Sequence, residues 1–155
     1  MLLKVTLLGL FPFIFGLPDD EQHTPPNYIT PTFTNVTVFT PPANWPNKRT
    51  SYARTVVLRH DHSNSILTSF TISPPGDAYL PVFQSTDEGK TWNELSRISF
   101  STQNYTGGQI LQPFLYELPE KVGSYPAGTI LASGNGIPGD RNSTNIELHA
   151  SIDKG

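Results

Sequence analysis

The sequence predicts an all-β protein. Its 155 residues include 15 prolines and 12 glycines, and only 15% of them are charged. This composition favours strands and turns over helices. Short segments with the alternation of strands recur along the chain, and turn residues separate them. A turn motif that follows the third strand of one group begins again near the last residue. These features predict a repeated four-stranded unit, which is the organisation of a β-propeller.

The N-terminal residues are predicted to direct the protein to the secretory pathway. Residues 1–16 read as a signal peptide, because Lys4 supplies the positive charge, residues 5–15 are apolar and Gly16 is a small residue for cleavage. A membrane anchor is the alternative, but a span needs about 20 apolar residues. Residues 17–34 form a Pro-rich leader. We therefore expect a secreted, extracellular protein without a membrane span.

The predicted strands begin at residues 35–40, where Val36 and Val38 alternate with polar side chains. This segment has no hairpin partner nearby in the sequence, so we expect it to close the ring by pairing with the last blade. The first blade is assigned to residues 51–100, with strands at 52–59, 66–72, 79–85 and 92–100. An incomplete second blade is assigned to residues 109–155, with strands at 110–118, 129–133 and 146–151.

The repeated turn motif carries the strongest signal. Residues 85–92 (STDEGKTW) fit the pattern S-x-D-x-G-x-T-W, and residues 151–155 (SIDKG) begin it again. Such a turn uses a short acidic side chain to accept N–H bonds, a glycine for positive φ and a tryptophan to cover the hairpin. Catalysis or calcium binding by the two aspartates is the alternative, but turn formation already explains them. The motif residues are Ser85, Asp87, Gly89, Thr91, Trp92, Ser151, Asp153 and Gly155.

Blade geometry predicts which loops face a substrate. Loops after the second strand of a blade share one face with the loops between blades, and the S-x-D-x-G-x-T-W turns lie on the other. The candidate substrate face therefore holds residues 47–54, 73–77, 100–112 and 134–144. Asp77 and Asp140 lie in these loops beside Gly or Pro, and we expect both to form turns.

Arg54 and Gln112 are the candidate substrate-binding residues, since each lies near the start of an innermost strand. The Arg54 guanidinium suits a carboxylate or sugar hydroxyls, although pairing with a neighbouring acid is an equally good interpretation. The two-residue period predicts one shared orientation along this strand for Tyr52, Arg54, Val56 and Leu58.

Composition excludes several function classes. The chain has no cysteine, so thiol nucleophiles and cysteine-based zinc sites are excluded. A net charge of −3 without a Lys/Arg cluster argues against nucleic acid as a partner. No metal site or cofactor is predicted, because metal-ligand spacing is missing among His23, His60, His62 and His149. Three sequons are candidates for N-glycosylation, at Asn35, Asn104 and Asn142.

The turn motif resembles the Asp-box, or bacterial neuraminidase repeat, of sialidase-superfamily propellers. Longer stretches resemble the fungal exo-arabinanase family, glycoside hydrolase family ninety-three: residues 35–42 (NVTVFTPP), 52–55 (YART), 112–119 (QPFLYELP), 126–138 (PAGTILASGNGIP) and 146–155. The resemblance implies a sialidase-like six-bladed propeller that degrades α-1,5-linked arabinan from chain ends with two carboxylates. It places both catalytic glutamates after the second Asp-box, so the chain reads as an N-terminal fragment. No catalytic motif surrounds Glu88, Glu94, Glu117 or Glu147.

Two classes of function remain open. The first is a secreted glycoside hydrolase that binds an arabinan-like polysaccharide, monomeric at full length and inactive as this fragment. The second is a non-catalytic propeller that binds glycan or protein, and sialidase activity is a third alternative. We expect the fragment to aggregate, because its second blade would expose an edge strand at 146–151 and the apolar side chains of Phe114, Tyr116 and Ile130.

Overall fold

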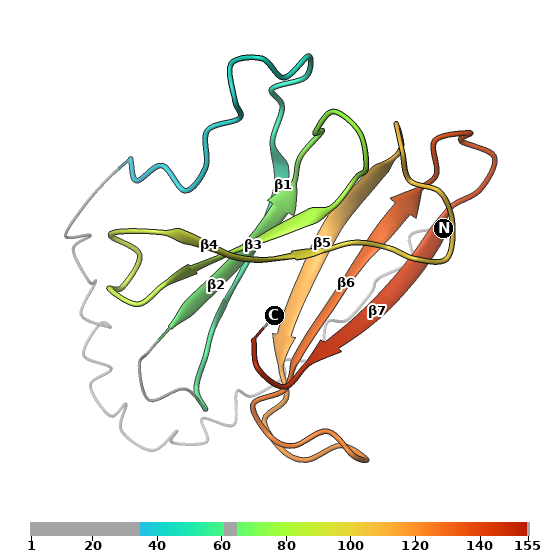
Figure 1. Cartoon of the computed structure of the whole chain (residues 1–155). Coiled ribbons are helices and arrows are strands. Elements are labelled where there is room, and N and C mark those ends of the chain that lie inside the picture. The colour runs from blue at the N-terminus through green and yellow to red at the C-terminus, as the bar shows by residue number, and fades with distance from the viewer. Residues whose placement is uncertain (1–34, 61–64, 155) are drawn as a thin grey trace, which may run out of the picture. The chain divides into compact units, whose positions relative to one another are not determined.

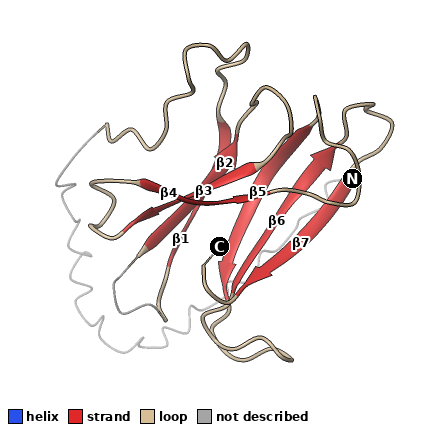
Figure 2. Ribbon diagram, in the orientation of Figure 1, coloured by secondary structure: helices blue, strands red, loops and turns tan. Residues whose placement is uncertain are grey.

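Antiparallel strands make up all the regular structure of the residues that the computed structural model describes, 35–60 and 65–154 (Figure 2). The all-β prediction is therefore confirmed for this part of the chain. The predicted signal peptide and leader lie outside the described residues, as do Gly155 and the turn at 61–64. The described residues contain no helix that could cross a membrane.

The first sheet follows the predicted order of strands and turns. It contains β1 (Ser51–Val57), β2 (Ile66–Thr71), β3 (Leu80–Ser85) and β4 (Asn93–Ile98), each paired with its neighbour in sequence (Figure 1). β2 and β3 are almost completely buried, whereas β1 and β4 form the exposed edges.

The second sheet has the same up-and-down order with one strand fewer. It contains β5 (Gln109–Glu117), β6 (Ile130–Ile137) and β7 (Asn145–Ser151). β6 extends well beyond the predicted strand at 129–133, because Gly134, Asn135 and Gly136 continue its pairing with β7 instead of forming a loop.

The two sheets pack face to face through an apolar core. One core cluster contains residues from both sheets, namely Leu58, Leu67, Val82, Leu115, Ile130 and Ala132. A second core cluster contains Ala78, Leu80, Phe100, Tyr105 and Ile110. Burial of each large apolar side chain contributes about 1.5–3 kcal/mol. Ile130 is thus a core residue, and its predicted place on the outer face of the second sheet is wrong. It pairs with Glu117 in β5 and faces the first sheet with Ala132.

Two glycines of β6 let the sheets approach closely. A Cβ atom built on Gly134 would lie 3.0 Å from the Leu80 side chain, and one on Gly136 would lie 2.6 Å from the Tyr105 hydroxyl. Real Cβ atoms essentially never come as close as the Gly136 contact, and the Gly134 contact is tight enough that the Leu80 side chain would have to shift. The glycine spacing in SGNG is therefore a packing feature.

The remaining face of the first sheet carries an aromatic cluster. Phe70 and Phe83 stack at 5.7 Å between ring centroids, and Phe39 packs on both at 5.6 and 5.8 Å. Residues 35–40 thus lie against this sheet but form no strand in the structure. The predicted strand would need a neighbour to supply its ladder, and no segment among the described residues does so. Its pairing with a last blade stays a prediction.

Candidate functional site

One end of both sheets gathers the loops predicted to face a substrate. The loop before β1, the β2–β3 loop, the β4–β5 connection and the β6–β7 loop all lie at this end, which we call the loop end. The long 118–129 loop lies at the opposite end (Figure 1). The two ends follow from the antiparallel order, because every second connection in an up-and-down sheet lies at the same end of the strands.

The loops at this end are joined by hydrogen bonds. The amide N–H of Gly107 donates to the Gly76 carbonyl at 3.0 Å, and that of Gly139 donates to the Asn104 carbonyl at 3.2 Å. The Thr106 hydroxyl donates to the Asp77 carboxylate. A cleft of about 300 Å³ lies among Gln103, Asn104, Thr106, Pro138, Gly139 and Asp140. The β4–β5 connection therefore ties the loops of the two sheets into one surface.

Asp77 and Asp140 both take part in local structure. Asp77 holds Thr106 of the neighbouring connection, and Asp140 accepts the amide N–H of Asn142 at 3.1 Å. In this arrangement the Asp140 side chain stabilises its own turn by accepting a hydrogen bond from the backbone two residues further along the chain. Neither carboxylate is left without a structural partner.

A β-bulge opens the first strand of each sheet at the loop end. In β1, Ser51 pairs with Thr71 and Arg54 with Ser69, so Tyr52 and Ala53 together oppose a single residue of β2. Tyr52 has φ of +55°, the left-handed region, which costs a non-glycine residue about 1–2 kcal/mol. The extra residue breaks the two-residue period, so the predicted shared orientation of Tyr52 and Arg54 is wrong. Tyr52 borders a cleft with Phe39 and Phe70, whereas Arg54 lies on the face shared with Val56.

Gln112 occupies the same place in the second sheet that Tyr52 occupies in the first. Leu111 pairs with Asn135 and Phe114 with Ser133, so Gln112 and Pro113 oppose one residue of β6. Gln112 has φ of +54° and an exposed side chain. The bulge also explains how Pro113 fits inside a strand, because a bulged position needs no ladder N–H.

Arg54 is exposed at the loop end. Its Nη1 donates to the Ala53 carbonyl at 3.1 Å, and among the described residues it forms no ion pair with an acid. The Arg54 carbonyl accepts the Thr68 hydroxyl at 3.0 Å, which holds the backbone in place. Of the two candidates, Gln112 corresponds to Tyr52, and Arg54 corresponds to Phe114. The sequence gives a signal for the bulge in β5, because Pro113 interrupts a strand pattern, but it gives no such signal for the bulge at Tyr52 in β1.

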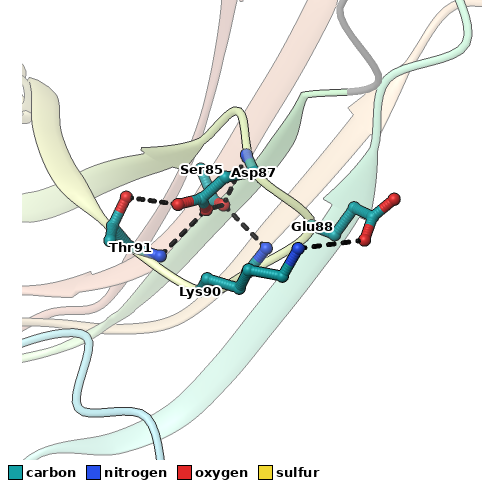
Figure 3. A network of polar contacts seen from close by, with 6 residues as sticks. Ser85, Asp87, Glu88, Lys90 and Thr91 are labelled. Carbon is teal, nitrogen blue, oxygen red and sulfur yellow. Dashed lines mark hydrogen bonds and ion pairs between the residues drawn. The ribbon is translucent and has the colours of Figure 1, made fainter. Parts of the chain in front are cut away.

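The 85–92 turn between β3 and β4 is closed by its own side chains (Figure 3). Asp87 accepts the Thr91 amide at 2.8 Å, the Thr91 hydroxyl at 2.7 Å and the Ser85 hydroxyl at 2.8 Å. Hydrogen bonds from Thr91 and Ser85 lower the pKa of Asp87 to about 2. The Ser85 hydroxyl accepts the Gly89 amide at 2.7 Å, and Trp92 Nε1 donates to the Gly89 carbonyl at 3.0 Å. Every polar atom of this aspartate is used inside the turn.

The turn after β7 repeats the start of this network. The Ser151 hydroxyl donates to Asp153 at 2.7 Å, as the Ser85 hydroxyl does to Asp87. Lys154 has positive φ at the position that Glu88 occupies in the first turn. Gly155 lies outside the described residues.

Four glutamates singled out in the sequence each take part in a structural contact. Glu88 forms an exposed ion pair with Lys90 at 3.5 Å, and Glu94 binds Arg97. Glu117 accepts the amide N–H groups of Arg59 at 2.7 Å and His60 at 3.1 Å.

Glu147 of β7 connects the second sheet to the β4–β5 connection. It accepts the amides of Ser101 at 3.3 Å and Thr102 at 3.2 Å, together with the Thr102 hydroxyl. Burial alone would raise the pKa of this carboxyl, but the Thr102 and Ser101 bonds outweigh it and lower the pKa below its ordinary value. The His149 ring stacks on Phe100 at 5.5 Å, and its Nε2 lies 3.4 Å from Glu147.

No set of acidic and histidine side chains in the described part of the chain is arranged to hold a metal ion. His23 and His62 lie outside the described residues. At the loop end the described side chains offer hydrogen bonding from amides and hydroxyls, beside the carboxylates of Asp77 and Asp140 and the exposed cations of Arg54 and Arg141.

Comparison with solved structures identifies similar enzymes. The chain is 41% identical to the α-L-arabinofuranosidase of Fusarium graminearum, with a TM-score of 0.67 over 79% of this chain, in complexes with an iminosugar inhibitor and with arabinobiose. It is 39% identical to the α-L-arabinanase of Penicillium chrysogenum in complex with arabinobiose, with a TM-score of 0.64. The match spans about a third of each enzyme, 33% and 34%. No family model and no curated protein sequence matches the chain.

Proposed function

We propose that this chain is the N-terminal part of a secreted family ninety-three glycoside hydrolase that releases sugars from the ends of α-1,5-linked arabinan. The resemblance to this family predicted from the sequence is confirmed by the solved structures, of which one is described as a GH93 enzyme. The observation that carries the proposal is 41% identity combined with the same fold over 79% of the chain. The chain spans only a third of those enzymes, so the activity belongs to a longer protein.

In this proposal the two sheets are the first two blades of a six-bladed ring. The second sheet supports the idea, because its outward face is apolar although it is exposed. Phe114, Tyr116, Ile146 and Leu148 all lie on this face. A third blade would cover it as the second sheet covers the first. Residues 35–40 would then pair with the last blade.

The catalytic carboxylates are proposed to come from later blades. Retaining glycosidases need two carboxyl groups about 5 Å apart at the substrate. The glutamates considered above instead hold backbone amides or form ion pairs. The chain by itself is therefore expected to be inactive, and its contribution is to bind sugar at the loop end.

A chimera tests the proposal. Residues 35–155 would replace the matching third of the Fusarium enzyme, and arabinose release from linear α-1,5-arabinan would be measured beside the isolated chain. We expect release by the chimera and none by the chain. A folded chimera that neither binds nor cleaves arabinan would contradict the proposed function, and measurable release by the chain alone would contradict the assignment of its catalytic groups to later blades.

Secretion and N-glycosylation are part of the same proposal. The asparagines of all three sequons, Asn35, Asn104 and Asn142, are exposed. Expression in a eukaryotic host should place the chain in the medium, cleaved after Gly16. Treatment with an amidase that removes N-glycans should lower its mass, and substitution of each asparagine by glutamine would identify the sites used.

A further inference from the structure

Both sheets carry the same backbone irregularity at the same place. One extra residue enters the first strand at the loop end, and the residue at its start is left-handed, with φ of +55° at Tyr52 and +54° at Gln112. Glycine would adopt this conformation without strain, yet a phenol and a carboxamide are found instead. Bulges next to binding sites redirect a side chain away from the regular alternation.

The surrounding structure holds this conformation firmly. The Gln112 amide donates to the Thr71 hydroxyl of the first sheet at 3.1 Å, and Thr71 is itself buried. In the first sheet the Thr68 hydroxyl donates at 3.0 Å to the Arg54 carbonyl, just after the bulge. Strained residues persist where neighbours fix them, and they concentrate at ligand sites. The strain is therefore retained by dedicated contacts between and within the sheets.

The two side chains also have the accessibility and chemistry of a sugar site. Tyr52 is 50% exposed and borders a cleft of about 390 Å³ that lies between residues 37–39 and β1. Gln112 is exposed at the equivalent position of the second sheet. A carboxamide both donates to and accepts from hydroxyl groups, and a tyrosine adds an apolar ring face and a hydroxyl. Neither side chain is charged, which suits a neutral sugar better than an acidic one.

We infer that Tyr52 and Gln112 are sugar-binding residues, each presented by the bulge of its sheet, and that their ligand is a neutral arabinofuranosyl unit. The inference rests on the proposed function and deepens it, because it names the side chains that recognise the substrate. The bulge gives each innermost strand one such residue at the loop end.

The chimera described above provides the test. Tyr52→Gly and Gln112→Gly remove the side chains and relax the left-handed backbone. We expect unchanged or higher thermal stability together with a KM for arabino-oligosaccharides raised roughly tenfold, which corresponds to about 1.4 kcal/mol. Gln109→Ala, on the same strand but before the bulge, is the matched control and should leave KM unchanged. A structural role alone would lower stability and leave KM unaffected.

The outcomes separate the inference from the proposed function. An active chimera whose KM does not respond to either substitution would overturn the inference and leave the proposed function standing. A folded chimera without arabinan binding would overturn both. If the chimera does not fold, arabinobiose is titrated into the chain carrying Ile146→Lys and Leu148→Lys, which oppose association through the exposed face of β7, and the titration is followed by amide NMR. Larger shifts at Tyr52 and Gln112 than at Gln109 are expected, and equal or absent shifts would overturn the inference.

Discussion

Gly136 of β6 lies directly against Tyr105 of the β4–β5 connection: a Cβ atom built on the glycine would be 2.6 Å from the tyrosine hydroxyl. The same Cβ would lie 2.7 Å from the Phe100 ring. The Phe100 and Tyr105 rings pack edge to face with 5.6 Å between their centroids, and both belong to the second core cluster. The closeness of the two sheets thus depends on a missing side chain.

Gly136→Ala should therefore destabilise the protein. Overpacking of a tight core costs about 1–3 kcal/mol, and the Tyr105 and Phe100 rings that the new Cβ would meet are both buried. Phe100→Leu removes part of the clash, so the double variant should lose less stability than the sum of the two single variants. Denaturant unfolding at low protein concentration measures all three. Strict additivity would show that Gly136 and Phe100 do not compete for the same space.

Asp87 should make the stability of the fold depend on pH below about 4. Its pKa is lowered to about 2 by the bonds from Thr91 and Ser85, so its contribution is complete above the unfolded value of about 3.9. That contribution is lost as pH falls from about 4 towards 2. Asp87→Asn should lower the unfolding midpoint at pH 7 and flatten its decline in this window.

The control for Asp87 is a carboxylate of the same turn. Glu88 is exposed and forms only a surface ion pair with Lys90. Such pairs contribute little, so Glu88→Gln should leave both the midpoint and the acid profile close to those of the unmodified chain. A profile that Asp87→Asn leaves unchanged would mean that the turn network does not couple to unfolding.

The strand pattern and the 85–92 turn could be predicted from the sequence, because alternation, turn residues and the S-x-D-x-G-x-T-W spacing are local signals. The C-terminal half of β6 could not be predicted, because Gly134 and Gly136 are typical of turns. Their role depends on close packing against the Leu80 and Tyr105 side chains, which are distant in the sequence. The different orientations of Tyr52 and Arg54 follow from a bulge that shifts the two-residue period, which the alternation in the sequence does not reveal. Side chains that connect the sheets, such as Glu117 and Glu147, act on residues far away in the sequence.

Glu147→Gln should weaken the connection between the sheets. The carboxylate accepts three hydrogen bonds from Ser101 and Thr102. A hydrogen bond to a charged group contributes about 1.5–3 kcal/mol to stability. An amide can accept at one atom only, so a loss of about 1–2 kcal/mol is expected. Hydrogen exchange should become faster at Thr102. Glu120→Gln, on the exposed 118–129 loop, is the control and should change neither quantity.

The outward face of the second sheet is the most exposed apolar surface of the described chain. Ile146 and Leu148 of β7 are 81% and 67% exposed, and the stacked rings of Phe114 and Tyr116 lie on β5. The polar residues of β7 face the other way, where Glu147 and His149 contact Ser101 and Phe100 of the β4–β5 connection. The alternation in β7 is therefore the reverse of that expected for a strand whose outer face meets water. β7 is also an edge strand, with unpaired backbone groups along one side.

The isolated chain should therefore self-associate through this face. Light scattering coupled to size-exclusion chromatography should show a mass that rises with concentration, because exposed apolar patches and free edges favour contacts between copies. Ile146→Lys combined with Leu148→Lys should restore most of the monomer, since lysine on an edge strand opposes pairing. Leu95→Lys makes the same kind of change on β4, the edge of the first sheet, and should leave the association unchanged. A sharp monomer peak for the unmodified chain, with one cooperative thermal transition, would show that the two sheets are stable without a further blade.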